Sequence, residues 1–345
     1  MYTIAIHPDK TNDKNNSDSS APYWIEYLQQ KGCRIKLVDA YSSDIIEQVR
    51  GCQGFMWRWL HGGYDARIAR RIIPVIENYL HIPCFPDLAT CWHYDDKVAQ
   101  KYLFEACQIP HPKTWYFTDK SRALHWVEKD AVFPLVLKLS EGAGSTGVTL
   151  IHSKNEAIHW LNLLFDNGIV SLNKIHFSCR IKDSIKYSFD SIFKGWANHR
   201  LGGNLLSYGY ILFQEFLPNN NWDIRVTIIG NRAFAFRRYN RENDFRASGS
   251  GLIDYNLSNS EHVFIKLGFD IAKALRCQSI AIDGLWNGNT PVVVEISYTY
   301  VQKAIFDSPG YWTKGCQEGE FIWHDGHIWP GTAQAIDFWD RIKEK

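Results

Sequence analysis

Two apolar segments on either side of an Asn-Gly-Asn turn constrain the fold of this chain more than any other feature. Residues 280–286 and 292–297 are rich in strand-forming side chains, and residues 287–291 between them favour a turn. If all five of these residues form the loop, the segments pair as a hairpin with Asp283 directly opposite Glu295. A four-residue loop would instead place the two acids on opposite faces.

The expected hairpin brings two negative charges together. Facing carboxylates repel each other, so one of them is usually protonated or both bind a shared cation. Oxygen ligands at this spacing suit Mg²⁺, which also tends to bind phosphate oxygens. Asp283 and Glu295 are therefore predicted to bind a metal, and Ser297 lies on the same face one step along. The alternative is a surface hairpin that carries two acids, but the three valines at 292–294 indicate a strand buried on both sides.

A length of 345 residues is enough for two or three domains. A hydrophobic content of 45% indicates a packed globular protein. Lys and Arg total 38 against 37 Asp and Glu, so bulk charge gives no reason to expect nucleic-acid or membrane binding. The eight cysteines include no Cys-x-x-Cys pair, which argues against a zinc ribbon and a secreted disulfide scaffold. The N-terminus is unlike a signal peptide and no apolar run reaches about 18 residues, so a cytoplasmic location is predicted.

The N-terminal part of the chain alternates strand and helix patterns, as in a βαβ domain. The expected strands cover 2–7, 34–38, 54–57 and 82–85, and the expected helices cover 22–31, 43–50 and 66–79. Loops at the carboxyl ends of parallel strands commonly hold ligands. The loop after Trp57, with Arg58 and His61, is therefore a second candidate site, unless it is an ordinary surface loop.

The rest of the chain shows helix and strand patterns in a different order. A helix is expected from about 94 to 107, followed by strands at 113–117, 133–140 and 148–152, a helix at 121–127, and a hairpin of 224–229 with 232–238. Residues 165–210 look like a loop-rich insertion without an assignment. The tail from Tyr311 is dense in Trp, His and Gly and is expected to pack as a cap.

Residues 142–147, Gly-Ala-Gly-Ser-Thr-Gly, match the pattern Gly-x-Gly-x-x-Gly. A dinucleotide-binding fingerprint needs a helix after the glycines, but the strand-like residues 148–151 follow, which disfavours an oxidoreductase. A Walker-type loop is absent from the sequence. The remaining interpretations are a flexible hairpin tip and a flap between two strands, whose backbone N–H groups can cover phosphates while Lys138 on the entering strand points toward the same anions.

In their order along the chain, these motifs resemble the ATP-grasp superfamily, and within it the carboxylate–amine ligases of the ribosomal-protein glutamate ligase type. The ordered set is Asp96-Lys97 before a helix, Ile109-Pro110-x-Pro112, Lys138 with the glycine loop, Gln214-Glu215-Phe216, Asp223-x-Arg225, and Asp283 with Glu295. The resemblance covers roughly residues 94–300 and departs from the family at Ser297, where the third metal ligand is usually Asn.

The resemblance implies an α/β N-terminal (pre-ATP-grasp) domain followed by a two-subdomain α+β ATP-grasp core. The corresponding parts are residues 1–93, the core subdomains at 94–204 and 205–310, and an aromatic-rich tail at 311–345. ATP with Mg²⁺, or Mn²⁺ in its place, would bind between the two core subdomains.

The resemblance also implies a role for each matching residue. The phosphates or the adenine edge would contact Lys97, Lys138 and the loop residues Gly142, Gly144, Ser145, Thr146 and Gly147. The adenine would meet the backbone of Gln214, Glu215, Phe216 and Leu217, and the ribose would meet Asp223. The metal would bind Asp283, Glu295 and Ser297.

The implied activity is an ADP-forming ligase that activates a carboxylate as an acyl phosphate for attack by an amine. Six arginines lie between 223 and 246, either as an anion-binding patch or as a solvated face. Arg225, Arg246 and Arg237 are the catalytic candidates, although Arg237 and Arg238 are neighbours on one strand and only one of them can face the site. The expected partners are small-molecule or peptide carboxylates and amines, with no nucleic acid or membrane, and a homodimer is compatible with this interpretation. The alternatives are a phosphotransferase acting on a hydroxyl and a non-catalytic ATP-binding protein.

Overall fold

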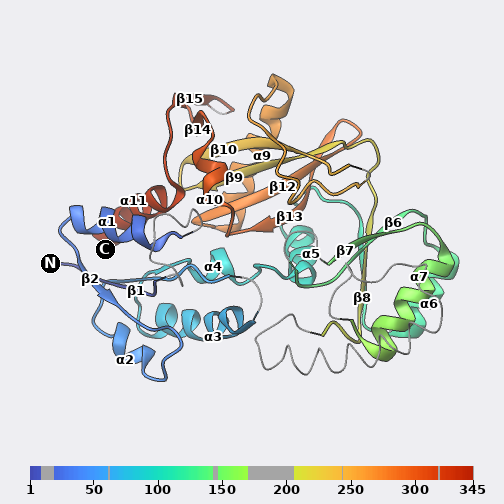
Figure 1. Cartoon of the computed structure of the whole chain (residues 1–345), viewed down its shortest axis with the longest axis horizontal. Coiled ribbons are helices and arrows are strands. Elements are labelled where there is room, and N and C mark those ends of the chain that lie inside the picture. The colour runs from blue at the N-terminus through green and yellow to red at the C-terminus, as the bar shows by residue number, and fades with distance from the viewer. Residues whose placement is uncertain are drawn as a thin grey trace.

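The computed structural model describes residues 1–8, 19–60, 63–142, 147–169, 206–242, 244–317 and 319–344. Three sheets organise these residues (Figure 1). We call them the N-terminal sheet, with strand order β2-β1-β3-β4, the middle sheet, β5-β8-β6-β7, and the large sheet, β13-β12-β9-β10-β14-β15 with β11 beside β10. None of the helices within the described ranges is long and apolar enough to span a lipid bilayer.

The N-terminal sheet is parallel and has helices on both faces, as the βαβ pattern predicts. Ala5 of β1 packs with Phe55 and Ile73 on one face, whereas Ile4 packs with Trp24 on the other. The elements are β1 (Thr3–Ile6), α1 (Ala21–Gln30), β2 (Arg34–Leu37), α2 (Ile45–Val49), β3 (Gly54–Met56), α3 (Gly63–Tyr79), β4 (Cys84–Phe85) and α4 (Leu88–Cys91).

The middle sheet is antiparallel and carries the glycine loop between two of its strands. Strand β6 pairs with β7, so a strand follows the loop, as the sequence predicts, and the dinucleotide-binding interpretation is excluded. Asp96 caps the helix that precedes this sheet, where its side chain accepts hydrogen bonds from the N–H groups of Val98 and Ala99. The elements are α5 (Lys97–Ala106), β5 (Thr114–Phe117), α6 (Lys120–Lys129), β6 (Leu135–Lys138), β7 (Val148–Ile151), α7 (Lys154–Asn162), the π-helix η1 (Leu163–Asn167) and β8 (Ile211–Glu215).

Strand β8 pairs with β5 and β6 although it lies in the expected range 205–310. The four-part division of the chain stays a prediction, and this pairing argues for moving its second boundary beyond Glu215. Most of the unassigned stretch 165–210 falls outside the described residues. Within its described part, η1 ends the preceding helix and Ile169 forms a β-bridge with Ser207.

The large sheet packs one face against helix α9 and the other against Tyr300, Ile305 and Ala333. Ile224, Val226 and Ile228 alternate along β9 and share a core with Phe264 and Phe269 of α9. The alternation leaves the intervening residues of β9 on the opposite face. The elements are β9 (Trp222–Ile229), β10 (Arg232–Tyr239), β11 (Ile253–Asp254), the 3₁₀ helix η2 (Asn259–Glu261), α9 (His262–Leu275), β12 (Ser279–Asn287), β13 (Thr290–Ser297), α10 (Gln302–Phe306), β14 (Gly310–Lys314) and β15 (Phe321–Asp325).

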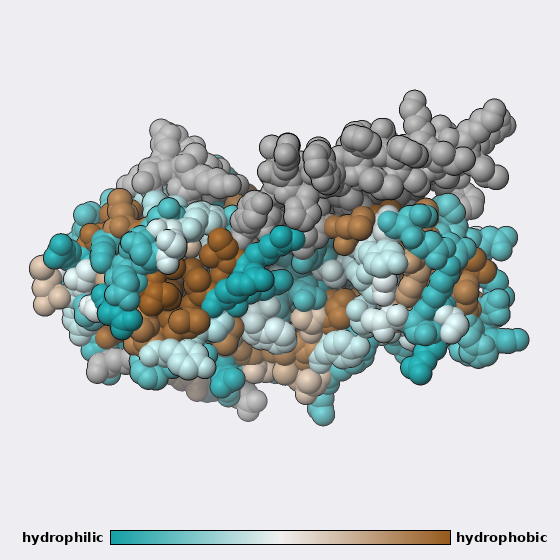
Figure 2. Space-filling view, turned by 90° about the horizontal axis from the view of Figure 1, so that it is seen from below, coloured by the Kyte–Doolittle hydropathy of each residue, from teal (hydrophilic) through white to brown (hydrophobic). Residues whose placement is uncertain are grey.

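The C-terminal tail is divided between two parts of the molecule. Strands β14 and β15 extend the large sheet, and helix α11 (Pro330–Lys343) packs on α1 beside the N-terminal sheet (Figure 1). The indole N–H of Trp24 donates a buried hydrogen bond of 3.0 Å to Oε1 of Gln334 across this contact. Seen from below, the end of the molecule that carries the N-terminal sheet exposes hydrophobic side chains among hydrophilic ones (Figure 2). The opposite end, which carries α6 and α7, is mostly hydrophilic.

Candidate functional site

The β12–β13 hairpin places Asp283 directly opposite Glu295, as the sequence predicts. The five-residue loop on which this expectation depended does not form, because Asn287 pairs with Thr290 and the turn consists of Gly288 and Asn289. A β-bulge compensates: Gly284 pairs with Val293, so one extra residue of β13 precedes Glu295. The bulge thus restores the facing of the two acids that a regular hairpin with this short turn would lose.

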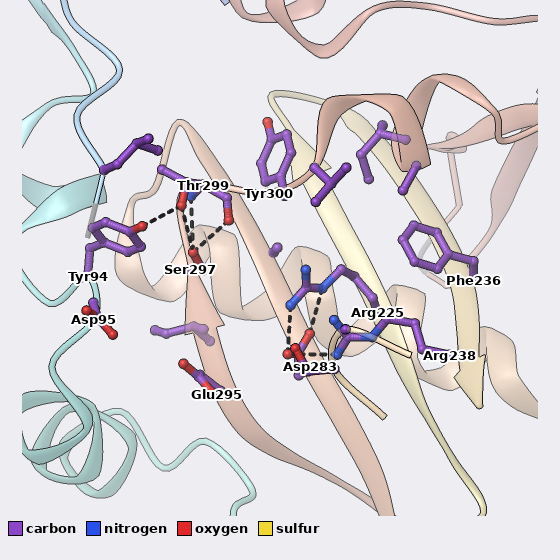
Figure 3. Close-up of a pocket in the computed structure, with 18 of the residues that line it drawn as sticks. Tyr94, Asp95, Arg225, Phe236, Arg238, Asp283, Glu295, Ser297, Thr299 and Tyr300 are labelled. Carbon is purple, nitrogen blue, oxygen red and sulfur yellow. Dashed lines mark hydrogen bonds and ion pairs between the residues drawn. The ribbon is translucent and has the colours of Figure 1, made fainter. Parts of the chain in front are cut away.

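A cavity of about 520 Å³ lies beside the two acids. Its lining comes from the large sheet, the segment after β13, helix α10, the loop after β3 and both ends of the glycine loop. Asp283 and Arg225 point toward each other, whereas the carboxylate of Glu295 lies on the side of Asp95 and Ser297 is bonded to Thr299 (Figure 3). Arg58 lines the same cavity, so the two candidate sites of the sequence are one, and His61 lies outside the described residues.

One group of charged residues, which we call the arginine network, consists of Asp223, Arg225, Arg238 and Asp283. Arg225 donates to Oδ1 and Oδ2 of Asp283, both at 2.7 Å, through Nε and Nη2. Arg238 donates in the same forked manner to Asp223 at 2.7 and 2.6 Å, and its Nη2 lies 2.9 Å from Oδ2 of Asp283. Burial opposes ionisation of Asp283, but the two guanidinium groups outweigh it and hold the pKa of this carboxyl well below its usual range.

The structure places Arg238, rather than Arg237, on the face of β10 that lines the cavity. Arg237 points to the other face, where its Nη1 donates to Asp254 at 2.7 Å and its Nε to Glu261 at 2.5 Å. The expectation that Arg237 faces the site is therefore wrong, because the alternation of the strand turns it away. Arg246 lies outside the lining and donates to Asp244 at 2.9 Å and to the carbonyl of Val148 at 3.2 Å.

A second group, the lysine network, consists of Asp95, Lys97, Lys138 and Glu295. Nζ of Lys97 lies 3.5 Å from Glu295 and 3.6 Å from Asp95, and it donates to the carbonyl of Gly142 at 3.1 Å. Nζ of Lys138 donates to the carbonyl of Val294 at 3.2 Å. The structure thus brings both predicted lysines to the hairpin, where a carbonyl at one end of the glycine loop also lies.

The two lysines respond differently to burial. Burial disfavours the charged form of Lys97, but the carboxylates of Glu295 and Asp95 outweigh it and raise its pKa. Burial lowers the pKa of Lys138 to about 8, since the more distant Glu295 offsets only part of the effect and Lys97 adds to it. Lys138 is therefore the cation of this site whose charge changes in a pH range close to neutral.

The segment expected to contact adenine runs from the end of β8 into the following loop. The side chain of Gln214 donates to Oγ1 of Thr114 at 3.1 Å, and Glu215 accepts from the N–H of Lys113 at 3.2 Å. Phe216 packs edge-on against Phe245, and Leu217 is buried. The contact with adenine stays a prediction.

The remaining expected contacts are placed in part. Gly144, Ser145 and Thr146 lie outside the described residues, whereas the carbonyl of Gly147 accepts from Leu139 at 2.8 Å. Asp223 is buried and both of its oxygens accept from Arg238, so the geometry does not support the expected ribose contact.

The donor set for a metal is two carboxylates and one hydroxyl. Ser297 Oγ donates to the carbonyl of Thr299 at 2.7 Å and accepts from its N–H at 3.1 Å, so this hydroxyl already belongs to a turn. The described residues contain no group of three or more His, Cys, Asp or Glu side chains arranged for a metal. Glu295, with a side chain 32% exposed, presents its carboxylate to the cavity, whereas Asp283 is tied to two arginines.

Sequence reasoning missed Arg238 as a site residue, and it missed Asp95 and Tyr300. Asp95 directly precedes the Asp-Lys pair that begins α5 and has a positive φ of 51°, which is uncommon for a residue with a side chain. No local signal marks Tyr300, which reaches the cavity through the segment between β13 and α10.

No family model matches the chain, and no curated protein matches it. Solved structures do match. D-cycloserine synthetase DcsG is 11% identical with a TM-score of 0.55 over 99% of both chains, and D-alanine–D-alanine ligase from Bacillus anthracis complexed with ATP is 16% identical with a TM-score of 0.54 over 100% of this chain and 96% of that one. N5-carboxyaminoimidazole ribonucleotide synthetase from Thermotoga maritima is 13% identical with a TM-score of 0.53 over 86% of this chain and 68% of that one. At these identities the matches show a shared fold.

Proposed function

Because the chain has the ATP-grasp fold, as its sequence motifs predict, we propose that it is an ADP-forming ligase that joins a carboxylate to an amine. One observation carries the proposal. Asp283 and Glu295 face each other beside one cavity, between Arg225 and the buried Arg238 on one side and two buried lysines on the other. The solved structures with this fold include a ligase complexed with ATP and two synthetases, which supports the same class of reaction.

The reaction has two steps. A carboxylate oxygen attacks the γ-phosphorus of ATP, and the bond to the leaving ADP breaks to give an acyl phosphate. The amine nitrogen then attacks the acyl carbon, a C–N bond forms, the C–O bond to phosphate breaks, and inorganic phosphate leaves. An ammonium substrate sheds two protons in becoming the amide nitrogen, of which inorganic phosphate carries one away at neutral pH and solvent takes the other.

The residues of this chain act on charge and position. Lys97, Lys138 and the glycine loop (Gly142, Gly144, Ser145, Thr146 and Gly147) bind the phosphates, and the segment Gln214, Glu215, Phe216 and Leu217 binds the adenine. Arg225 and Arg238 stabilise negative charge on the transferring group. Asp223 positions Arg238, and Arg246 holds the strand that follows the glycine loop.

We assign the metal site to Asp283, Glu295 and Ser297, whose hard oxygen atoms have the chemistry that Mg²⁺ or Mn²⁺ prefers. When bound, the cation supplies neutralisation of the charge on the phosphates. Glu295 is the ligand with an accessible face, and Asp283 joins it only through the lone pairs that Arg225 and Arg238 leave available.

The test is Mg²⁺-dependent release of ADP or AMP from ATP with pooled acids and pooled amines. ADP and phosphate that appear only when both a carboxylate and an amine are present would support the ligase. AMP would contradict the acyl-phosphate mechanism. A phosphorylated hydroxyl product would indicate a phosphotransferase, and ATP binding without turnover in any pool would indicate a binding protein.

A further inference from the structure

The inference rests on the proposed ligase function and names a substrate class for it. We propose that the amine substrate is an α-amino acid with an apolar side chain. The apolar side chain would lie against Phe236, Tyr300 and Ile305, and Arg58 would bind the carboxylate that stays unreacted.

The register of the large sheet separates a charged row from an apolar one on the cavity face. Phe236, Arg225, Asp283 and Glu295 stand in one row across β10, β9, β12 and β13. Two residues further along, the same face carries a second row of small or apolar side chains, namely Phe234, Thr227, Ala281 and Ser297. A substrate whose reacting group lies at the charged row therefore meets apolar side chains immediately beside it.

The apolar wall is preformed and belongs to a packed core. Phe236, Ala281, Tyr300 and Ile305 share one buried cluster while also lining the cavity. The hydroxyl of Tyr300 is bonded to Ser279 at 2.6 Å and to the amide of Gln334 at 2.9 Å. Because these partners satisfy the hydroxyl, the side chain offers the cavity its ring.

Helix α10 is fixed over this wall. The hydroxyl of Tyr255 donates to the carbonyl of Ala304 at 2.8 Å, and the ring of Tyr255 packs edge-on against Phe236. Ala304 and Ile305 of this helix line the cavity. A charged group placed here would lose water without gaining a partner, which is strongly unfavourable, whereas an aliphatic or aromatic group would be stabilised.

Among the described residues, three cations line the cavity, and two of them already pair with a carboxylate. Arg225 and Arg238 are both held by Asp283. Within the described residues, no carboxylate pairs with Arg58, whose Nη2 lies 3.5 Å from the carbonyl of Tyr300. A guanidinium fork binds a carboxylate in a bidentate manner, so the free carboxylate of an amino acid finds its partner at Arg58, on the side of the N-terminal sheet.

The size of the cavity supports a small substrate. Its volume of about 520 Å³ lies in the range of small-molecule sites, roughly 300–1,000 Å³. An amino acid with an apolar side chain matches all three parts of the cavity: its side chain contacts the apolar wall, its amine lies at the charged row, and its free carboxylate pairs with Arg58. Aspartate would place its second charge on the wall, and leucinamide would leave Arg58 without its anion.

The first experiment compares leucine, phenylalanine, aspartate and leucinamide as amines in the ADP-release assay with one pool of acids. We expect kcat/KM for leucine or phenylalanine to exceed that for aspartate and for leucinamide at least tenfold. A preference for aspartate, or equal use of leucine and leucinamide, would overturn the substrate class. Calorimetric binding of leucine and aspartate in the presence of ADP does not depend on turnover. If leucine binds more tightly than aspartate but no ADP forms, the ligase function fails, and what stands is a cavity selective for apolar amino acids. If leucine does not bind, the substrate class fails.

Two pairs of variants locate the contacts. Arg58→Gln should raise KM for leucine at least tenfold and leave KM for leucinamide unchanged, while Arg50→Gln, at an exposed position on α2's C-terminal side, should change neither. Ile253→Lys, in the cavity lining, should reduce the preference for leucine over aspartate, because the new cation can pair with the second carboxylate of aspartate, while Ile322→Lys on β15, at a similarly exposed position, should not. The assignment would be contradicted if Arg58→Gln raised KM equally for leucine and leucinamide. It would also be contradicted if the two isoleucine variants changed the preference for leucine over aspartate equally.

Discussion

The arginine network and the lysine network flank the same cavity with equal formal charge and different construction. Each combines two cations with two carboxylates. In the arginine network, Arg225 donates two hydrogen bonds to Asp283 and Arg238 donates two to Asp223, at 2.6 to 2.7 Å. In the lysine network, the ion pairs of Lys97 span 3.5 and 3.6 Å, and the partner of Lys138 among the described residues is the carbonyl of Val294.

The difference shows how one site can hold some side chains in fixed positions while the charge of another depends on its surroundings. A guanidinium is planar, permanently charged and matched to a carboxylate, so a forked pair fixes position. A lysine is a compact point charge whose pKa changes readily on burial, as that of Lys138 does. The arginine network holds Asp283 in place, and under the proposed function the lysine network, with its longer contacts, is the part that meets the polyphosphate.

The largest effect is expected from removing a buried arginine. Arg238→Met leaves Asp223 and Asp283 buried with less positive charge, and breaking a buried pair in this way costs about 3–5 kcal/mol of the free energy of unfolding. Denaturant unfolding of the variant would measure it. The double variant Arg238→Met/Asp223→Asn should recover part of the loss, because one uncompensated charge is gone. Unchanged stability in the single variant would show that the arginine network does not hold the fold.

A variant in the lysine network should instead lose turnover before it loses the fold. Glu295→Gln keeps the shape of the side chain but removes the charge that faces Lys97 and the cavity. By analogy with the loss of one stabilising group in an active site, ADP release should fall about 10²–10³-fold, or roughly 3–4 kcal/mol. Thermal unfolding should change less than in Arg238→Met, because Asp95 still faces the buried Lys97. Glu105→Gln, whose carboxylate pairs with Lys101 on α5, is the matched control, and retained turnover in Glu295→Gln would refute the metal assignment.

Strand periodicity explains what the sequence could predict of this site. Side chains alternate along a strand with a period of two residues, so a loop with an odd number of residues places Asp283 opposite Glu295. A two-residue turn with one bulge produces the same pairing. The register shift lies at Gly284, where an added Cβ would lie 2.6 Å from the ring of Phe264 on α9. The signal within the hairpin is the glycine itself, because an isolated glycine in a strand pattern indicates a bulge or a close approach, although Phe264 lies outside the hairpin.

The choice between Arg237 and Arg238 shows the same limit. Alternation predicts that only one of them faces the cavity, and either choice satisfies it. Partners from other elements decide which arginine faces the cavity, because Glu261 accepts a hydrogen bond from Arg237 on the face that packs against α9. Likewise, the contact of Lys97 with Glu295 joins helix α5 to β13, and only the family resemblance could suggest it.

The smallest effect is a pH dependence that belongs to the lysine network alone. The pKa of Lys138 is about 8 in the free protein, so this lysine is protonated below pH 8 and neutral above it. A bound polyphosphate favours the charged form, so ATP affinity should be constant below pH 8 and fall by up to about tenfold per pH unit above it, until the pKa of the bound state is reached. Calorimetry between pH 7 and about 9.5 measures this slope. Lys138→Met should bind ATP more weakly and without the slope, whereas Lys101→Met, outside the cavity, should keep it. A flat profile in the unmodified protein would mean that the lysine network is held as firmly as the arginine network.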